Sequence, residues 1–182
     1  MILIVAGRTA VVLILISCGK EEHNEGVTLE PVIEKEFLSY VQLFEKIGKI
    51  NKSSIRFSSS EDIVLMENVI GRDLKGWCDI NRRSIFIDKD GWIQFSADEK
   101  EVLILHELGH CEVGLKHNRA LVRITQESGN SWHREKSIMY PYVISGATYQ
   151  KYHTEYLEQL RLEIENPNEA NSKAYDFDYI ED

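Results

Sequence analysis

The chain has 182 residues, a formal charge of −9 and a hydrophobic fraction of 43%. This length and composition predict one globular domain with a substantial core, and they exclude a collagenous, low-complexity or wholly disordered chain. Acids outnumber Lys and Arg by 30 to 21, which argues against a nucleic-acid partner, because such binding depends on clustered cations and counterion release.

The N-terminal segment has the pattern of an export signal followed by a tether. Arg8 precedes an apolar run, Ala10–Ile16, which is long enough for the core of a signal peptide and too short to span a bilayer. The run leads into Leu-Ile-Ser-Cys, which ends at Cys18 and resembles the lipobox of bacterial lipoproteins. This resemblance implies that residues 1–17 are a lipoprotein signal peptide and that lipidated Cys18 anchors the exported protein to a membrane. Residues 18–30 then form a flexible tether; in the alternative, Cys18 ends an ordinary signal peptide.

The following residues predict one helix and then short strands. Apolar residues recur at helical spacing from Pro31 to Ile47, and proline suits the first turn of a helix. Strand-like runs follow at Ser54–Phe57, Ile63–Val69 and Arg83–Asp88, with a glycine-containing turn region, Gly71–Asp79, between the last two. A helix and strands before a second helix predict an α+β fold rather than alternating βαβ units.

The clearest element is a helix from Ala97 to Val113. It begins with a capping box, in which the Ser96 hydroxyl and the Glu99 carboxylate each satisfy an otherwise unpaired amide. An apolar run follows at once, and Gly114 stands where the chain turns after the helix.

This helix carries the sequence His-Glu-Leu-Gly-His at residues 106–110. Residues four apart lie on one face of a helix with their Cβ atoms about 5–6 Å apart, so His106 and His110 can bind a single ion. Glu107 lies about 60° around the helix from His110, close enough to hold a metal-activated water without binding the metal. The pattern indicates zinc chemistry, because two neutral imidazoles leave the ion Lewis acidic and an adjacent carboxylate can accept a proton from the water.

Two further features follow the helix: His117 stands three residues after Gly114, and Ser-Ile-Met-Tyr-Pro occupies residues 137–141. Together with the helix motif they resemble the metzincin clan of zinc endopeptidases, in which HExxHxxGxxH is followed by a Met-turn. The resemblance covers about residues 83–142. It implies one catalytic Zn²⁺ with three histidine ligands, Glu107 as general base and Met139 as a hydrophobic floor beneath the metal; the ligands are His106, His110 and His117.

The chain departs from the clan pattern by one residue. Three residues, rather than two, separate the second histidine of the helix from Gly114. A helix longer by one residue rotates its end by about 100°, so His117 needs a different path back to the metal. The competing third ligands are His133 and Glu127, which stand in a polar segment, Asn118–Lys136, expected to be a loop that borders or closes over the cleft.

Two tyrosines follow the Met-turn. In some metzincins a tyrosine two residues after the methionine stabilises the oxyanion, and here that position is Pro141. Tyr140 and Tyr142 flank it and are candidates for the oxyanion role, with aromatic packing as the alternative. The resemblance also implies that an edge strand near Arg83–Asp88 pairs with an extended peptide or protein substrate.

Cys78 and Cys111 remain after lipidation of the first cysteine. In an exported protein they could form a disulfide that closes a loop of about 30 residues, worth roughly 3–4 kcal/mol. The sequence leaves this pairing open. Binding of the metal by Cys111 is disfavoured, because its side chain points about 100° away from the face that the two histidines share.

The C-terminal part predicts a helix and then a tail. From Ala147 to Ile164, tyrosines and aliphatic residues recur at helical spacing. His153 in this stretch is expected to be a surface or packed histidine. Residues 166–182 are acidic without a helical stripe, which predicts a disordered tail.

The sequence therefore predicts a small α+β, zincin-like domain over residues 31–165. Its mixed twisted sheet packs on an N-terminal helix and an active-site helix, and a Met-turn and a C-terminal helix follow. The expected function is that of a monomeric, membrane-anchored zinc endopeptidase. The alternatives are a zinc hydrolase of cell-wall peptides and a non-catalytic zinc-containing binding lipoprotein. Glu107 argues against the last, because a structural zinc site needs no base.

Overall fold

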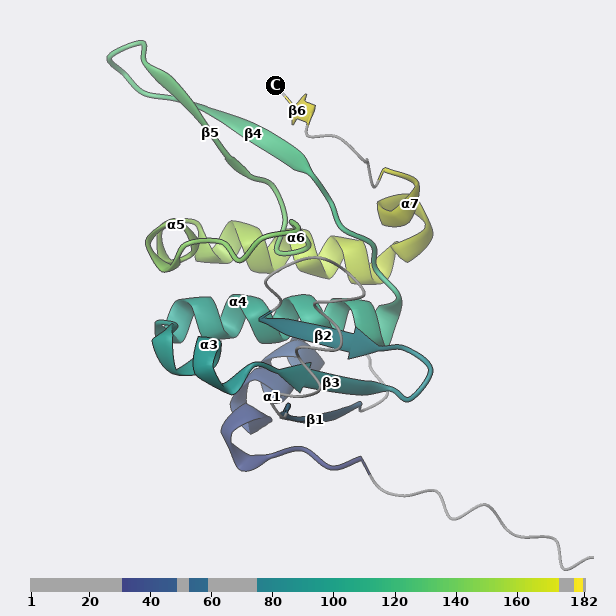
Figure 1. Cartoon of the computed structure of the whole chain (residues 1–182). Helices are drawn as coiled ribbons and strands as arrows, with labels where there is room; N and C mark the ends of the chain where they lie inside the picture. Colours follow the sequence, from purple (N-terminus) through teal and green to yellow (C-terminus); the bar gives the residue numbers. More distant parts are fainter. Residues whose placement is uncertain (1–30, 49–52, 59–74, 174–178, 182) are drawn as a thin grey trace, which may run out of the picture. The chain divides into compact units, whose positions relative to one another are not determined.

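The structure, a computed structural model, describes residues 31–48, 53–58, 75–173 and 179–181 (Figure 1). The expected signal peptide, Cys18, the tether and the expected strand Ile63–Val69 lie outside the described residues. Pro31–Asp182 belong to one compact unit. Among the helices described, none combines the length and the apolar character that a membrane crossing requires.

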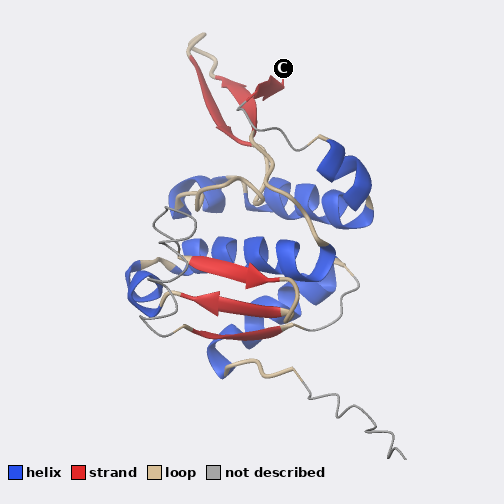
Figure 2. Cartoon of the chain, turned by 45° about the vertical axis from the view of Figure 1, so that its right-hand side comes forward, coloured by secondary structure: helices blue, strands red, loops and turns tan. Residues whose placement is uncertain are grey.

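A mixed three-stranded sheet forms one layer of the fold (Figure 2). Its strands are β1 (Ser54–Phe57), β2 (Gly76–Asp79) and β3 (Ser84–Ile87), in the order β1-β3-β2. β1 runs parallel to β3, whereas β2 runs antiparallel to it. The predicted α+β class with a mixed sheet is therefore confirmed.

Strand β2 corrects two expectations. Gly76–Asp79 were expected in a turn region because of the nearby glycines, but Trp77 and Cys78 have β-type side chains and pair with Phe86 and Ile85 of β3. The strand at residues 83–88 was expected at an edge. Instead, β3 is the central strand, and β2 is the edge strand beside the helix that carries the histidines. Among the described strands, β3 is therefore paired on both sides, and the edge beside α4 belongs to β2.

The N-terminal helix begins later than expected. Residues before Glu34 are extended, and Ile33 bridges Ile55 of β1. The backbone N–H of Ile55 donates to the carbonyl of Val32 at 2.9 Å, so pairing with the sheet outcompetes the first helical turn. A 3₁₀ turn, Lys35–Phe37, leads into α1 (Leu38–Ile47), whose apolar face is buried as predicted.

Helix α4 (Ala97–Leu108) runs through the core. Its predicted capping box is present, with Glu99 N donating to Ser96 Oγ and Ser96 N donating to the Glu99 carboxylate. α1 and α5 both contact α4, and β2 lies alongside it (Figure 1). A short helix that the sequence did not predict, α3 (Lys89–Gln94), precedes it. The Asp88 side chain caps α3 by accepting from the N–H groups of Asp90 and Gly91. This N-cap aspartate is the sequence feature from which the start of α3 could have been predicted.

The segment expected as a polar loop after His117 forms a hairpin. Its strands β4 (Ala120–Thr125) and β5 (Ser131–Glu135) pair antiparallel, and a turn with Gly129 at φ +85° joins them. Most side chains of these two strands are exposed or half-buried, so the alternation of apolar and polar residues that indicates a strand was not recognised in the sequence. Arg134 fastens the hairpin to the helices, because it pairs with Glu155 and lies over the ring of Tyr152 at 4.5 Å.

The C-terminal region contains more regular structure than expected. One predicted helix is divided at Tyr152 into α5 (Gly146–Lys151) and α6 (His153–Glu165). The sequence predicts disorder from residue 166, whereas α7 (Pro167–Ser172) is helical and β6 (Tyr179–Glu181) pairs in parallel with β4. Pro167 suits the first turn of α7, and long-range hydrogen bonds, described below, hold this short helix in place.

Candidate metal centre

The helix that carries the histidines ends in a π-helical turn, Gly109–Val113. A π turn holds one more residue than an α turn, so it absorbs the extra residue between His110 and Gly114. Gly114 then adopts the left-handed conformation, with φ +72° and ψ 28°, and its N–H bonds to the carbonyl of His110 at 3.0 Å. The chain therefore turns back toward the helix. The extra residue, which was expected to direct His117 away from the metal, is accommodated within the π-helical turn.

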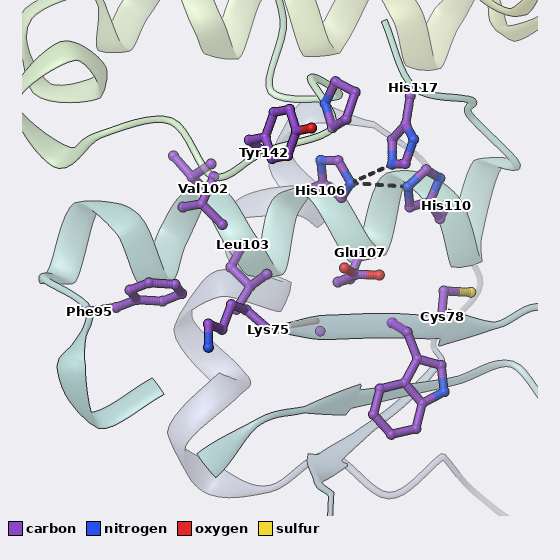
Figure 3. Close-up of a pocket in the computed structure, with 14 residues that line it drawn as sticks. Lys75, Cys78, Phe95, Val102, Leu103, His106, Glu107, His110, His117 and Tyr142 are labelled. Atoms are coloured by element: carbon purple, nitrogen blue, oxygen red, sulfur yellow. Dashed lines mark hydrogen bonds between the residues drawn. The ribbon is translucent and has the colours of Figure 1, made fainter. Parts of the chain in front are cut away.

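Three histidines converge at this turn (Figure 3). The Nε2 atom of His106 lies 3.0 Å from Nε2 of His110 and 3.3 Å from Nε2 of His117. Ligand atoms of the three residues all lie within 4.8 Å of one another, and they form a group that could hold a metal ion. Nitrogens bound to one tetrahedral zinc at 2.0–2.1 Å would lie about 3.3 Å apart, so the spacing suits a small cation.

The opposite ring nitrogens explain why a cation fits. Nδ1 of His106 lies 2.8 Å from the carbonyl oxygen of Ile138, and Nδ1 of His110 lies 2.6 Å from that of Leu115. A carbonyl only accepts, so each Nδ1 carries the proton and each Nε2 presents a lone pair. Burial lowers the pKa of His106 well below its ordinary value, with His110 as the next contributor, and burial also lowers the pKa of His110. These imidazoles are therefore neutral and suited to bind a metal.

Glu107 lies between α4 and β2, beside the histidines (Figure 3). A Cβ placed on Gly76 of β2 would lie 3.2 Å from its Oε1, so the carboxyl group approaches the edge strand closely. Its side chain is 5% exposed, and burial raises its pKa to about 8. The carboxyl group lines the same cavity as the three histidines.

Met139 packs against the ligand-bearing helix. It is 1% exposed, and a Cβ on Gly109 would meet its sulfur at 2.5 Å, so the residue before His110 must be glycine for this contact. Ser137 Oγ accepts from Met139 N at 3.0 Å and fixes the turn. Met139 thus lies directly against the turn that carries His110.

The competing ligands lie elsewhere. Glu127 is in the β4–β5 turn and His133 is in β5, and both are exposed. Within the described part of the chain, neither belongs to the metal-compatible group. Of the two candidate tyrosines, Tyr142 lines the cavity and Tyr140 is not among its lining residues. The oxyanion role therefore stays a prediction for Tyr142, and its geometry does not favour Tyr140.

The cavity has a volume of about 670 Å³ and extends along α4 away from the histidines. One wall is the edge strand, with Lys75, Gly76 and Trp77. Four apolar side chains that the sequence analysis did not single out also line the cavity: Phe95, Val102, Leu103 and Val143. Val102 and Leu103 precede His106 on α4 by one turn, and this spacing could have indicated that they line the same cavity.

A disulfide joins Cys78 of β2 to Cys111 of the π-helical turn, with the Cα atoms 5.5 Å apart. The predicted pairing is confirmed. Beside it, Arg83 Nη2 donates to Glu112 Oε2 at 2.8 Å. The disulfide therefore joins the edge strand to the π-helical turn, and the ion pair joins the same turn to the residue that precedes β3.

Comparisons with models of known protein families, with curated proteins and with solved structures found no match. The chemistry of this centre is therefore inferred from its residues and their geometry.

Proposed function

We propose that the protein is a zinc-dependent endopeptidase of metzincin-like chemistry. The observation that carries the proposal is the convergence of three imidazole Nε2 atoms beside a buried glutamate, in a cavity with an edge strand as its wall. The donor set supports zinc, because three neutral imidazoles are a frequent ligand set of catalytic zinc and leave a coordination position open.

Each residue has a distinct role in this proposal. Nε2 atoms of His106, His110 and His117 hold the ion. Zinc bound there supplies Lewis acidity toward a water molecule and a substrate carbonyl. Glu107 acts in its ionised form, which the positive charge of a bound ion favours against the effect of burial. It accepts a proton from the attacking water at a carboxylate oxygen and passes it to the nitrogen of the leaving amine. Tyr142, at the cavity wall, is the candidate donor to the oxyanion.

The substrate is proposed to be an extended peptide. β2 is an edge strand of its sheet among the described strands, and it lines the cavity, so a peptide can add to it through backbone hydrogen bonds. The apolar end of the cavity then receives one large apolar side chain of the substrate, because burial of such a side chain is worth about 1.5–3 kcal/mol.

We further propose that lipidated Cys18 anchors the enzyme to a membrane outside the cytoplasm. The lipobox-like sequence supports this placement, and the disulfide fits an oxidising compartment. Mass spectrometry of the protein from a bacterial host tests the anchor: the expected N-terminus is Cys18 with an added lipid mass. An unmodified N-terminus at another residue would contradict it.

The test of function compares three zinc-loaded proteins: the wild type, Glu107→Gln and the matched exposed control Glu127→Gln. Each is incubated with an unfolded protein substrate and with purified cell wall, and fragments are identified by mass spectrometry. We expect the wild type and Glu127→Gln to cleave the protein substrate. Glu107→Gln should bind zinc but cleave at least 100-fold more slowly, because general base catalysis contributes about 10²–10⁴-fold.

The other outcomes separate the alternatives. Fragments from cell wall alone would replace the endopeptidase with a cell-wall peptide hydrolase. Zinc binding without cleavage of either substrate would contradict both enzyme proposals and favour a binding protein. Equal cleavage by Glu107→Gln and the wild type would contradict the role of Glu107.

A further inference from the structure

The segment that delivers His117 is held by side chains from the C-terminal helices. Asn171 of α7 accepts from the N–H of Lys116 at 2.8 Å and donates through Nδ2 to the carbonyl of Gly114 at 3.0 Å. These two bonds bracket Leu115, whose carbonyl is the partner of His110 Nδ1 at 2.6 Å. One amide side chain thus fixes the backbone between the second and third histidines.

A second anchor lies immediately after His117. Glu163 of α6 is 5% exposed and accepts from Asn118 Nδ2 at 3.0 Å and from Ser137 Oγ at 2.7 Å. Asn118 N also donates to the carbonyl of Met139 at 2.8 Å. The same carboxylate therefore joins the residue after His117 to the Met-turn.

These contacts matter because the chain between the π-helical turn and β4 has no regular structure of its own. His106 and His110 are fixed by α4 and the turn that ends it, whereas His117 depends on the path of this segment. Ordering a backbone segment costs conformational entropy, and a ligand that must be ordered when the metal binds lowers the metal affinity by that cost. Anchors present before the metal binds remove the cost.

We propose that Asn171 and Glu163 are positioning residues that preorganise His117 and so set the metal affinity of the site. The inference rests on the proposed metal centre, but it does not depend on the reaction. It assigns to α7, in the acidic C-terminal region, a role in fixing the backbone that carries His117.

The decisive variant is Asn171→Ala, with Ser172→Ala as its matched control on the same exposed turn of α7. Affinity for Zn²⁺ is measured on the purified full chain by competition with a chelator, and the Co²⁺ absorption spectrum reports the ligand set. Removal of residues that orient metal ligands costs about 10–100-fold in affinity. We expect Asn171→Ala to bind Zn²⁺ about tenfold more weakly than the wild type, and Ser172→Ala to bind as the wild type does.

Glu163→Gln is the second variant, with Glu165→Gln on the same helix as its control. A glutamine cannot accept from Asn118, Gln159 and Ser137 together, because one of its two polar atoms is a donor. We expect Glu163→Gln to weaken Zn²⁺ binding by about tenfold. Melting temperatures of the metal-free proteins show whether any loss reflects unfolding; Asn171→Ala should melt with the wild type.

The outcomes distinguish the inference from the proposed metal centre on which it rests. If Asn171→Ala and Glu163→Gln both bind Zn²⁺ as tightly as their controls, the positioning role is overturned and the metal centre stands. If the wild type binds no Zn²⁺, the metal centre and the inference both fall.

Discussion

The candidate metal centre has two halves that differ in how the fold secures them. The helix half carries His106 and His110, and the loop half carries His117. His106 and His110 lie on α4 and the π-helical turn, and local hydrogen bonds, a capping box and a disulfide fix this half. His117 lies in a segment that depends on Asn171 and Glu163, which are more than 40 residues distant in sequence. The helix half also has long-range contacts, namely the disulfide and the bond between His106 and Ile138, but its backbone is helical. The loop half has no regular structure and depends on side chains of α6 and α7. The two halves should therefore respond differently to substitution.

The largest expected effect comes from removing the ligand of the loop half. Binding of zinc by four ligands contributes about 10–16 kcal/mol, so an equal share for one ligand is about 2.5–4 kcal/mol, or about two to three orders of magnitude in affinity. We expect His117→Ala to weaken Zn²⁺ binding by this amount and His133→Ala to leave it unchanged. Isothermal titration calorimetry measures both, and a stronger loss in His133→Ala would assign the third ligand to the hairpin.

The next effect concerns the covalent tie of the helix half. The Cys78–Cys111 disulfide closes a loop with a sequence separation of 33, and such a crosslink stabilises a protein by about 3–4 kcal/mol. We expect the double variant Cys78→Ser/Cys111→Ser to lose that free energy of unfolding in urea denaturation. An unfolding midpoint equal to that of the oxidised wild type would show that the bond adds no stability.

A smaller effect is expected at Gly114, which joins the helix half to the loop half. Gly114 and Gly129 both have positive φ, +72° and +85°, and nothing lies within 4 Å of a Cβ at either position. Alanine at each should cost about 1–2 kcal/mol through backbone conformation alone. We expect both variants to lose this stability in urea denaturation, but only Gly114→Ala to weaken Zn²⁺ binding, since only that glycine leads to His117. Equal Zn²⁺ affinities in the two variants would contradict this division.

The smallest effect tests the start of α4. Loss of an N-cap hydroxyl costs about 1 kcal/mol, so Ser96→Ala should lower the free energy of unfolding by that amount without altering Zn²⁺ affinity.

Hydrogen bonds from Ser96 lower the pKa of Glu99. The stabilising contribution of the Glu99 carboxylate is therefore complete above its ordinary pKa and is lost as pH falls through the lowered value. Urea denaturation between pH 3 and pH 7 should show a weaker acid-dependent loss in Glu99→Gln than in the wild type. Identical profiles would contradict a stabilising role for this carboxylate.

The sequence predicted the helix half of the site well because its signals are local. The capping box, the spacing of His106 and His110 and the glycine at the helix end all act within a few turns. The motif also indicated His117, but not the π-helical turn that brings it back, because one extra residue can be absorbed by an α-helix, a bulge or a loop.

The rest could not be predicted for identifiable physical reasons. β2 was missed because glycine signals beside Trp77 suggested a turn, and only pairing with β3 makes it a strand. α7 has a helical start at Pro167, but its position depends on Asn171 bonding to backbone groups 55 and 57 residues earlier. Hydrogen bonds between a side chain and a distant backbone leave no periodic pattern in a sequence.

X-ray absorption spectroscopy of the zinc-loaded protein reports directly which ligands surround the ion. We expect three imidazole nitrogens at about 2.0–2.1 Å in the wild type, and two in His117→Ala. A zinc site with sulfur ligands, or one whose spectrum is the same in His117→Ala as in the wild type, would contradict the three-histidine centre.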